Sequence, residues 1–113
     1  MVQTGTQEPS QKLASHIVAR PDIWEKIQVV FPEDPINAGE IIARESSFNP
    51  SIYNVTSNAC GLGQAYPCDK QPCEIVDTPQ AADCQLQWIR EYVNNRYGDF
   101  NEAVAFHNLN GWY

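Results

Sequence analysis

Four cysteines constrain the fold of this chain more than any other feature, because all of them fall between residues 60 and 84. An even number of cysteines in a short chain predicts disulfides, and four cysteines allow three pairings. The chain has no Cys-x-x-Cys pair, and its two histidines, His16 and His107, are too far apart in sequence for a finger-like zinc site. We therefore expect two disulfides, no metal and an oxidising location outside the cytoplasm, either secreted or on the cell surface. Of the possible pairings we favour Cys68 with Cys73 and Cys60 with Cys84.

Length and charge narrow the class of protein. The 113 residues fit one domain, and 42% hydrophobic and 11% aromatic residues are typical of a globular chain. The net charge of −7 argues against partners such as nucleic acid and anionic membrane surfaces. No apolar run is long enough to cross a membrane, and residues 1–10 lack the apolar core of a signal peptide. We expect a monomer, with a disordered linker or added tail at residues 1–12 and one folded domain at 13–113.

Prolines mark the starts of three expected helices. Pro21 opens the first, Asp34 and Pro35 form the cap and first residue of the second, and Thr78-Pro79 begins the longest, which Gly98 ends. Residues 46–78 are rich in Pro, Gly and Asn, so we expect loops there, with at most a short hairpin around residues 53–66. The apolar faces predicted for the first and longest helices are Ile23, Ile27, Val30 and Phe31, and Leu86, Ile89, Val93 and Tyr97.

The second of these helices carries the most informative acid. If it runs from Pro35 to about Arg44, then Glu45 continues an apolar face made of Ala38, Ile41 and Ile42. Such a carboxylate lies at the edge of the core, where partial burial favours its protonated form. A glycosidase needs that property in its acid. The alternative is a glutamate in solvent, or one paired with Arg44.

The sequence around and after Glu45 resembles the catalytic domain of lytic transglycosylases, a lysozyme-like family that cleaves the glycan strands of peptidoglycan. The run Gly-Leu-Gly-Gln-Ala at 61–65 and the ending at 110–113 resemble most the small transglycosylase-like domains of secreted Gram-positive surface proteins. The resemblance covers residues 22–113. Its blocks are Glu45-Ser46, Phe48-Asn49-Pro50, Asn-Ala-Cys-Gly-Leu-Gly-Gln at 58–64 and Ala-Val-Ala-Phe-His-Asn at 103–108.

This resemblance implies an α+β fold that is mostly α, with a helical body, a small loop and β-hairpin lobe, and a substrate cleft between them. It also implies a single-glutamate mechanism without a cofactor, in which Glu45 acts first as acid and then as base, and a 1,6-anhydro product. None of Asp69, Glu74, Asp77 and Asp99 makes a convincing second carboxylate. The residues expected to bind the substrate are Ser46, Gly63, Gln64, Tyr66, His107 and Asn108.

The chain departs from the family pattern at three positions. Gly63 stands where the family commonly has methionine, Asn58 stands at the first glycine, and His107 replaces a tyrosine. Tyr66, together with Trp112 and Tyr113, is a candidate to stack on sugar rings, whereas Trp24 and Trp88 are expected in the core.

Two other functions are compatible with the sequence. The same fold can serve as a non-catalytic cell-wall binding module, and a disulfide-stapled inhibitor or toxin is a third possibility. Hydrolysis of the glycan, instead of the anhydro-forming reaction, also stays open.

Overall fold

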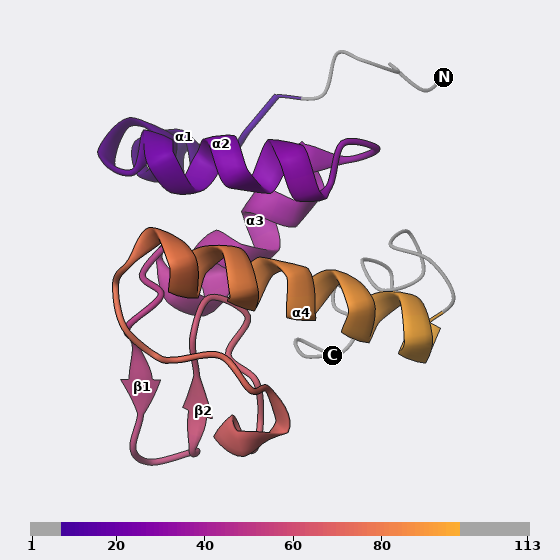
Figure 1. Ribbon diagram of the computed structural model, residues 1–113. Coiled ribbons are helices and arrows are strands. Elements are labelled where there is room, and N and C mark those ends of the chain that lie inside the picture. The colour runs from indigo at the N-terminus through magenta and orange to yellow at the C-terminus, as the bar shows by residue number, and fades with distance from the viewer. Residues whose placement is uncertain (1–7, 98–113) are drawn as a thin grey trace.

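The structure is a computed structural model that describes residues 8–97. The helices are α1 (Gln11–Ala19), α2 (Pro21–Val30), α3 (Pro35–Ser46) and α4 (Pro79–Tyr97), with strands β1 (Tyr53–Asn54) and β2 (Ala59–Cys60) and a short 3-10 helix, η1 (Cys68–Lys70). Figure 1 shows α1 and α2 at one end of the molecule, a small hairpin at the other, and the helices α3 and α4 between them. This arrangement is α+β and mostly helical, as expected.

The helices begin where the sequence places their caps. Asp34 Oδ1 accepts a hydrogen bond from the backbone N of Asn37 at 3.3 Å, and Thr78 Oγ1 accepts one from Ala81 N at 3.1 Å. The predicted starts at Pro21, Pro35 and Pro79 are therefore confirmed.

The N-terminal boundary differs from the expectation. Helix α1 begins at Gln11, so Gln11 and Lys12 belong to the folded domain and not to a tail. Ser10 caps this helix, and its backbone N and hydroxyl both donate to the Glu40 carboxylate at 2.7 Å. That polar anchor to α3 carries no hydrophobic pattern, which is why it could not be seen in the sequence.

The core lies among the four helices. The predicted face of α2 is buried at Ile23, Ile27 and Phe31, with Val30 partly buried. Trp24 and Trp88 are also partly buried against the core, as expected. The α4 stripe is buried at Leu86, Ile89 and Val93, while the side chain of Tyr97 and Gly98 lie outside the part of the chain that the structure describes.

A small lobe, residues 47–78, follows α3. Its two strands pair antiparallel, with Tyr53 opposite Cys60 and Asn54 opposite Ala59, which confirms the short hairpin. The main chain of Cys60 then pairs with Ala65, through N–O distances of 3.1 and 2.9 Å. The rest of the lobe is irregular apart from η1.

The four cysteines form two disulfides, but the favoured pairing is wrong. Cys60 bonds Cys68, and Cys73 bonds Cys84. Because Cys60 pairs with Ala65, the chain doubles back beside it and brings the Cα of Cys68 within 5.2 Å. The next segment reaches the first turns of α4, where Cys73 meets Cys84. Two disulfides are compatible with a secreted protein.

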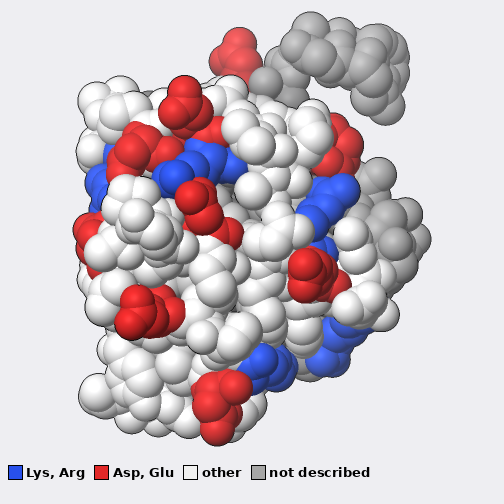
Figure 2. Space-filling model, in the orientation of Figure 1, with Lys and Arg blue, Asp and Glu red and all other residues white. Residues whose placement is uncertain are grey.

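Some of the charged side chains on the surface form ion pairs. Arg20 bridges Asp22 and Asp77, both at 3.0 Å, and Lys26 pairs with Asp83 at 2.7 Å. The face seen in Figure 2 accordingly shows Lys and Arg beside Asp and Glu. The hydrogen bond from Arg20 lowers the pKa of the Asp22 carboxyl. In residues 8–97, none of the helices has the length and apolar character required to traverse a bilayer.

Candidate functional site

Glu45 lies in the last turn of α3 and is partly buried. Ala38, Ile41 and Ile42, which share its face, are all buried, so the predicted position at the edge of the core is confirmed. The guanidinium Nε of Arg44 donates to the backbone oxygen of Glu40 at 3.3 Å. The helix thus presents Glu45 where the core meets the surface.

The helix ends at Ser46, one residue after this acid. Ser47 caps α3 in the left-handed conformation, with φ of 54°, and Phe48 follows with φ of 61°. Two successive left-handed residues cannot continue a right-handed helix. The fully buried Phe48 ring lies 5.7 Å from the His16 ring, which fixes the chain as it leaves α3 for the lobe.

Ser46 does not face a binding surface. Ser46 is 1% exposed, and its hydroxyl donates to the backbone oxygen of Ile42 at 2.9 Å. A hydroxyl that bonds one turn back in its own helix is a common arrangement for serine. Ser46 therefore supports the end of the helix, and its burial does not fit the expected role as a substrate contact.

The residues Gly-Leu-Gly-Gln at 61–64, which we call the motif turn, form a tight reversal. Gln64 N donates to Gly61 O at 3.1 Å, and both residues have positive φ, 78° at Gly61 and 50° at Gln64. The side-chain amide of Gln64 donates to the same oxygen at 3.0 Å. Glycine is suited to the first of these positions because it has no Cβ. The Gln64 amide nitrogen thus closes its own turn.

Gly63 is a glycine for a packing reason. A Cβ built on it would lie 2.8 Å from both Cγ1 and Cδ1 of Ile89 on α4. Real Cβ atoms do not approach that closely, so the motif turn rests directly on α4. Gly63 was among the residues expected to bind the substrate, and the contact with Ile89 already accounts for its lack of a side chain.

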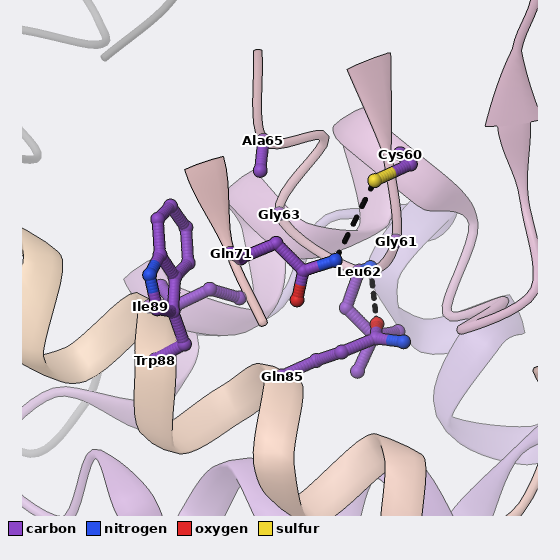
Figure 3. Close-up of a pocket in the computed structure, with 9 residues that line it drawn as sticks. All are labelled: Cys60, Gly61, Leu62, Gly63, Ala65, Gln71, Gln85, Trp88 and Ile89. Atoms are coloured by element: carbon purple, nitrogen blue, oxygen red, sulfur yellow. Dashed lines mark hydrogen bonds between the residues drawn. The ribbon is translucent and has the colours of Figure 1, made fainter. Parts of the chain in front are cut away.

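Gln85 is a buried polar residue of the candidate site that the sequence did not single out. It is 2% exposed, and Figure 3 shows its side chain reaching from α4 to the motif turn, where Oε1 accepts from Leu62 N at 2.8 Å. Its Nε2 donates to Pro50 O at 3.0 Å and to Glu74 O at 2.8 Å. One buried amide thus joins the segment after Glu45, the motif turn and the segment before α4. A signal existed, since Gln85 precedes Ile89 by one helical turn on the apolar stripe.

A hollow between the motif turn and α4 is too small for a sugar. Its lining residues, drawn in Figure 3, leave a volume of about 10 Å³, which is room for about one water molecule. Gln71, 6% exposed, contributes an Oε1 atom without a hydrogen-bond partner among the described residues. The hollow belongs to the packing of the lobe.

Tyr66 is 63% exposed and stands beside Gln64 in a crevice that also includes Trp88 and Tyr92. The structure therefore brings three of the expected binding residues, Gly63, Gln64 and Tyr66, together in one crevice. His107 and Asn108, like Trp112 and Tyr113, lie outside residues 8–97. All four cysteines are in disulfides.

Comparison with models of protein families, with curated proteins and with solved structures gave no match to this chain. The function is therefore inferred from its own residues.

Proposed function

We propose that this domain cleaves the β-1,4 glycosidic bond of peptidoglycan between N-acetylmuramic acid and N-acetylglucosamine, outside the cytoplasm, on a lysozyme-like fold. The observation that carries the proposal is the set of hydrogen bonds that the Gln85 side chain makes. Two sequence blocks that resemble lytic transglycosylases, the one around Glu45 to Pro50 and the motif turn, are held within hydrogen-bonding distance of one buried amide. Such shared support suits two parts of one site.

Glu45 supplies the acid and base chemistry of this proposal. Its carboxylic acid donates a proton to the leaving glycosidic oxygen as the anomeric carbon becomes oxocarbenium-like. The 6-hydroxyl of the sugar that carries this anomeric carbon then attacks it, and the Glu45 carboxylate takes up the proton of that hydroxyl. The product is a 1,6-anhydro sugar, no water is consumed, and Glu45 returns to its protonated state.

The position of Glu45 supports this role. The residue is partly buried on the apolar face of α3, and the chain turns sharply into the lobe directly behind it. A helical body followed by a small hairpin lobe is the arrangement that the resemblance implies. The two disulfides are compatible with an enzyme that works outside the cell.

The test is Glu45→Gln, which is nearly isosteric but has no proton to donate. We expect release of soluble fragments from purified peptidoglycan to fall by about 100-fold or more, the usual contribution of a general acid. Glu25→Gln, an exposed site on α2, is the matched control and should digest at the wild-type rate. Wild-type digestion by Glu45→Gln overturns the proposal.

Mass spectrometry of the wild-type digest separates the remaining outcomes. A product lighter by one water than the hydrolysed fragment identifies the anhydro reaction, whereas the hydrolysed fragment identifies a lysozyme-like hydrolase. Wild-type protein that sediments with cell walls but releases no soluble fragments would show that the same fold acts as a binding module.

A further inference from the structure

The two disulfides differ in how well a reagent in solution can reach them. We call Cys73–Cys84, which ties the lobe to α4, the α4 bridge, and Cys60–Cys68, which lies within the lobe, the lobe bridge. In the α4 bridge Cys73 is 8% exposed, but Cys84 is an exposed residue. In the lobe bridge Cys60 is 1% exposed and Cys68 is partly buried. A thiol in solution therefore reaches the α4 bridge more readily, because the rate of exchange depends on access to a sulfur atom.

Gln71 connects the two bridges. Its Nε2 donates to Cys60 Sγ at 3.5 Å, as Figure 3 shows, and to the backbone oxygen of Cys73 at 3.3 Å. Gln71 is 6% exposed, so its amide lies against the lobe bridge inside the lobe. Movement of Cys73 would therefore withdraw the amide that covers Cys60.

The α4 bridge also joins the same two segments as the Gln85 side chain. Glu74 directly follows Cys73 in the lobe. Gln85 directly follows Cys84 on α4, and its Nε2 donates to Glu74 O at 2.8 Å. Gln85 Oε1 accepts from Leu62 N of the motif turn at 2.8 Å. The α4 bridge thus fixes a segment that helps to hold Gln85, and with it the motif turn.

Residues 71–77 have few other means of staying against α4. Only Gln71 and Cys73 in this segment are buried, and Val76 is 41% exposed. Asp77 pairs with Arg20 at 3.0 Å, but an ion pair near the surface contributes little. A segment with so few buried contacts opens at a low cost in free energy once its covalent link is broken.

We propose that the α4 bridge is a thiol-exchange site, and that its reduction detaches residues 71–77 from α4 and releases the motif turn. The co-reactant is a dithiol. One of its thiolates attacks Cys84 Sγ, the S–S bond breaks, and the Cys73 sulfur leaves as a thiolate and takes up a proton. The second thiol of the co-reactant then displaces the Cys84 sulfur. The dithiol ends as a disulfide and has supplied both electrons.

This inference adds regulation to the proposed function and rests on it for one consequence. The motif turn belongs to the proposed site, so the domain is inactive where thiols stay reduced and gains activity where disulfides form. The opening of the bridge itself is tested without turnover.

The first test treats the wild-type protein with dithiothreitol, stops samples at intervals by alkylation and maps the labelled cysteines by mass spectrometry. Cys73 and Cys84 should be labelled at least about tenfold faster than Cys60 and Cys68, since access limits exchange. In the protein reduced only at the α4 bridge, hydrogen exchange at Leu62 should quicken. Equal or faster labelling of Cys60 and Cys68 overturns the inference, and so does unchanged exchange at Leu62.

Two double variants test the order of these events. Cys73→Ser with Cys84→Ser should speed reduction of the lobe bridge by about tenfold, because Gln71 is no longer held over Cys60. Cys60→Ser with Cys68→Ser is the matched control and should leave the rate at the α4 bridge within about twofold of the wild-type rate. Variants that change the two rates equally, or not at all, contradict the inference. Should either variant fail to fold by circular dichroism, the labelling order in the wild-type protein decides.

Digestion of peptidoglycan separates this inference from the proposed function. The Cys73→Ser, Cys84→Ser protein should release fragments at least about tenfold more slowly than the oxidised wild-type protein, since a displaced site loses much of its rate. Digestion at the wild-type rate by this variant overturns the inference and leaves the proposed function standing. Oxidised wild-type protein that releases no fragments defeats the proposed function, whereas the labelling order still decides whether the α4 bridge opens first.

Discussion

The helical body and the lobe of this protein are stabilised in different ways. The body, α1 to α4, buries apolar faces against one another, with Leu13, Ile27, Phe31 and Leu86 fully inside. The lobe, residues 47–78, has strands of only two residues and places few large apolar side chains in the core, chiefly Phe48 and Leu62. Hydrophobic burial therefore stabilises the body, and the lobe needs other means.

Covalent and polar links provide those means. The Cys60–Cys68 disulfide cross-links two parts of the lobe, and the Cys73–Cys84 disulfide ties the lobe to α4. Gln85 also holds the lobe to α4, through three hydrogen bonds. Asn54 closes the hairpin turn, where its Oδ1 accepts from Thr56 N at 3.0 Å and Ser57 N at 3.2 Å. Binding segments are commonly loops held by a rigid scaffold, and this lobe fits that arrangement.

Removing both disulfides should lower the free energy of unfolding more than the other changes proposed for the lobe. The bridges close short loops, with sequence separations of 8 and 11, and together they should contribute about 5 kcal/mol to the free energy of unfolding. Reduction should expose the lobe first. Hydrogen exchange should quicken at Gly61 and Leu62 while amides such as Ile27 and Phe31 stay protected.

Two double variants separate the bridges. Cys60→Ser with Cys68→Ser, and Cys73→Ser with Cys84→Ser, should each remove about half of the effect, and peptide mapping of the oxidised protein should recover the same two pairs. An unchanged unfolding midpoint after reduction would contradict the view that covalent links stabilise the lobe.

Replacing Gln85 should have the next largest effect. Gln85→Leu has a similar size but leaves Leu62 N, Pro50 O and Glu74 O without their partner, so we expect a loss of about 3 kcal/mol in the free energy of unfolding. Denaturant unfolding followed by circular dichroism measures it. Gln87→Leu, two residues along α4 and exposed, is the control and should change stability by less than about 0.5 kcal/mol. If the two variants lose equal stability, Gln85 does not join body and lobe.

The same contrast explains what could be predicted from the sequence. Local capping and periodicity correctly predicted the helix starts at Pro21, Pro35 and Pro79. They also predicted the buried face of α3 that leads to Glu45. These signals act within one or two turns of a helix. Most of the helical body can therefore be predicted from such local signals in the sequence.

The lobe depends on contacts between distant segments, which no local pattern encodes. The disulfide pairing follows from the pairing of Cys60 with Ala65, where the chain turns back. Gly63 is required by its contact with Ile89. Ser46 is buried because its hydroxyl bonds the backbone at the end of α3. Composition predicted loops at residues 46–78, and the structure has them from residue 47 on, apart from the hairpin and η1. Only the fold shows what each loop contacts.

Substituting Gly63 should have the smallest effect, and it tests the surface where the lobe meets the body. The Cβ of Gly63→Ala would lie 2.8 Å from two atoms of Ile89, so we expect a loss of about 1 to 2 kcal/mol from overpacking. Denaturant unfolding again provides the measurement.

A double-mutant cycle makes this prediction specific. In an Ile89→Ala protein, which is itself less stable by about 2 to 4 kcal/mol, the cavity leaves room for the new methyl group, so Gly63→Ala should add little further loss. An equal loss in both backgrounds would contradict direct packing of the motif turn on α4. The opposite result is that Gly63→Ala keeps full stability and slows the digestion of peptidoglycan. That result would mean that the glycine is needed for the glycan to approach the backbone, and not for packing of the motif turn on α4.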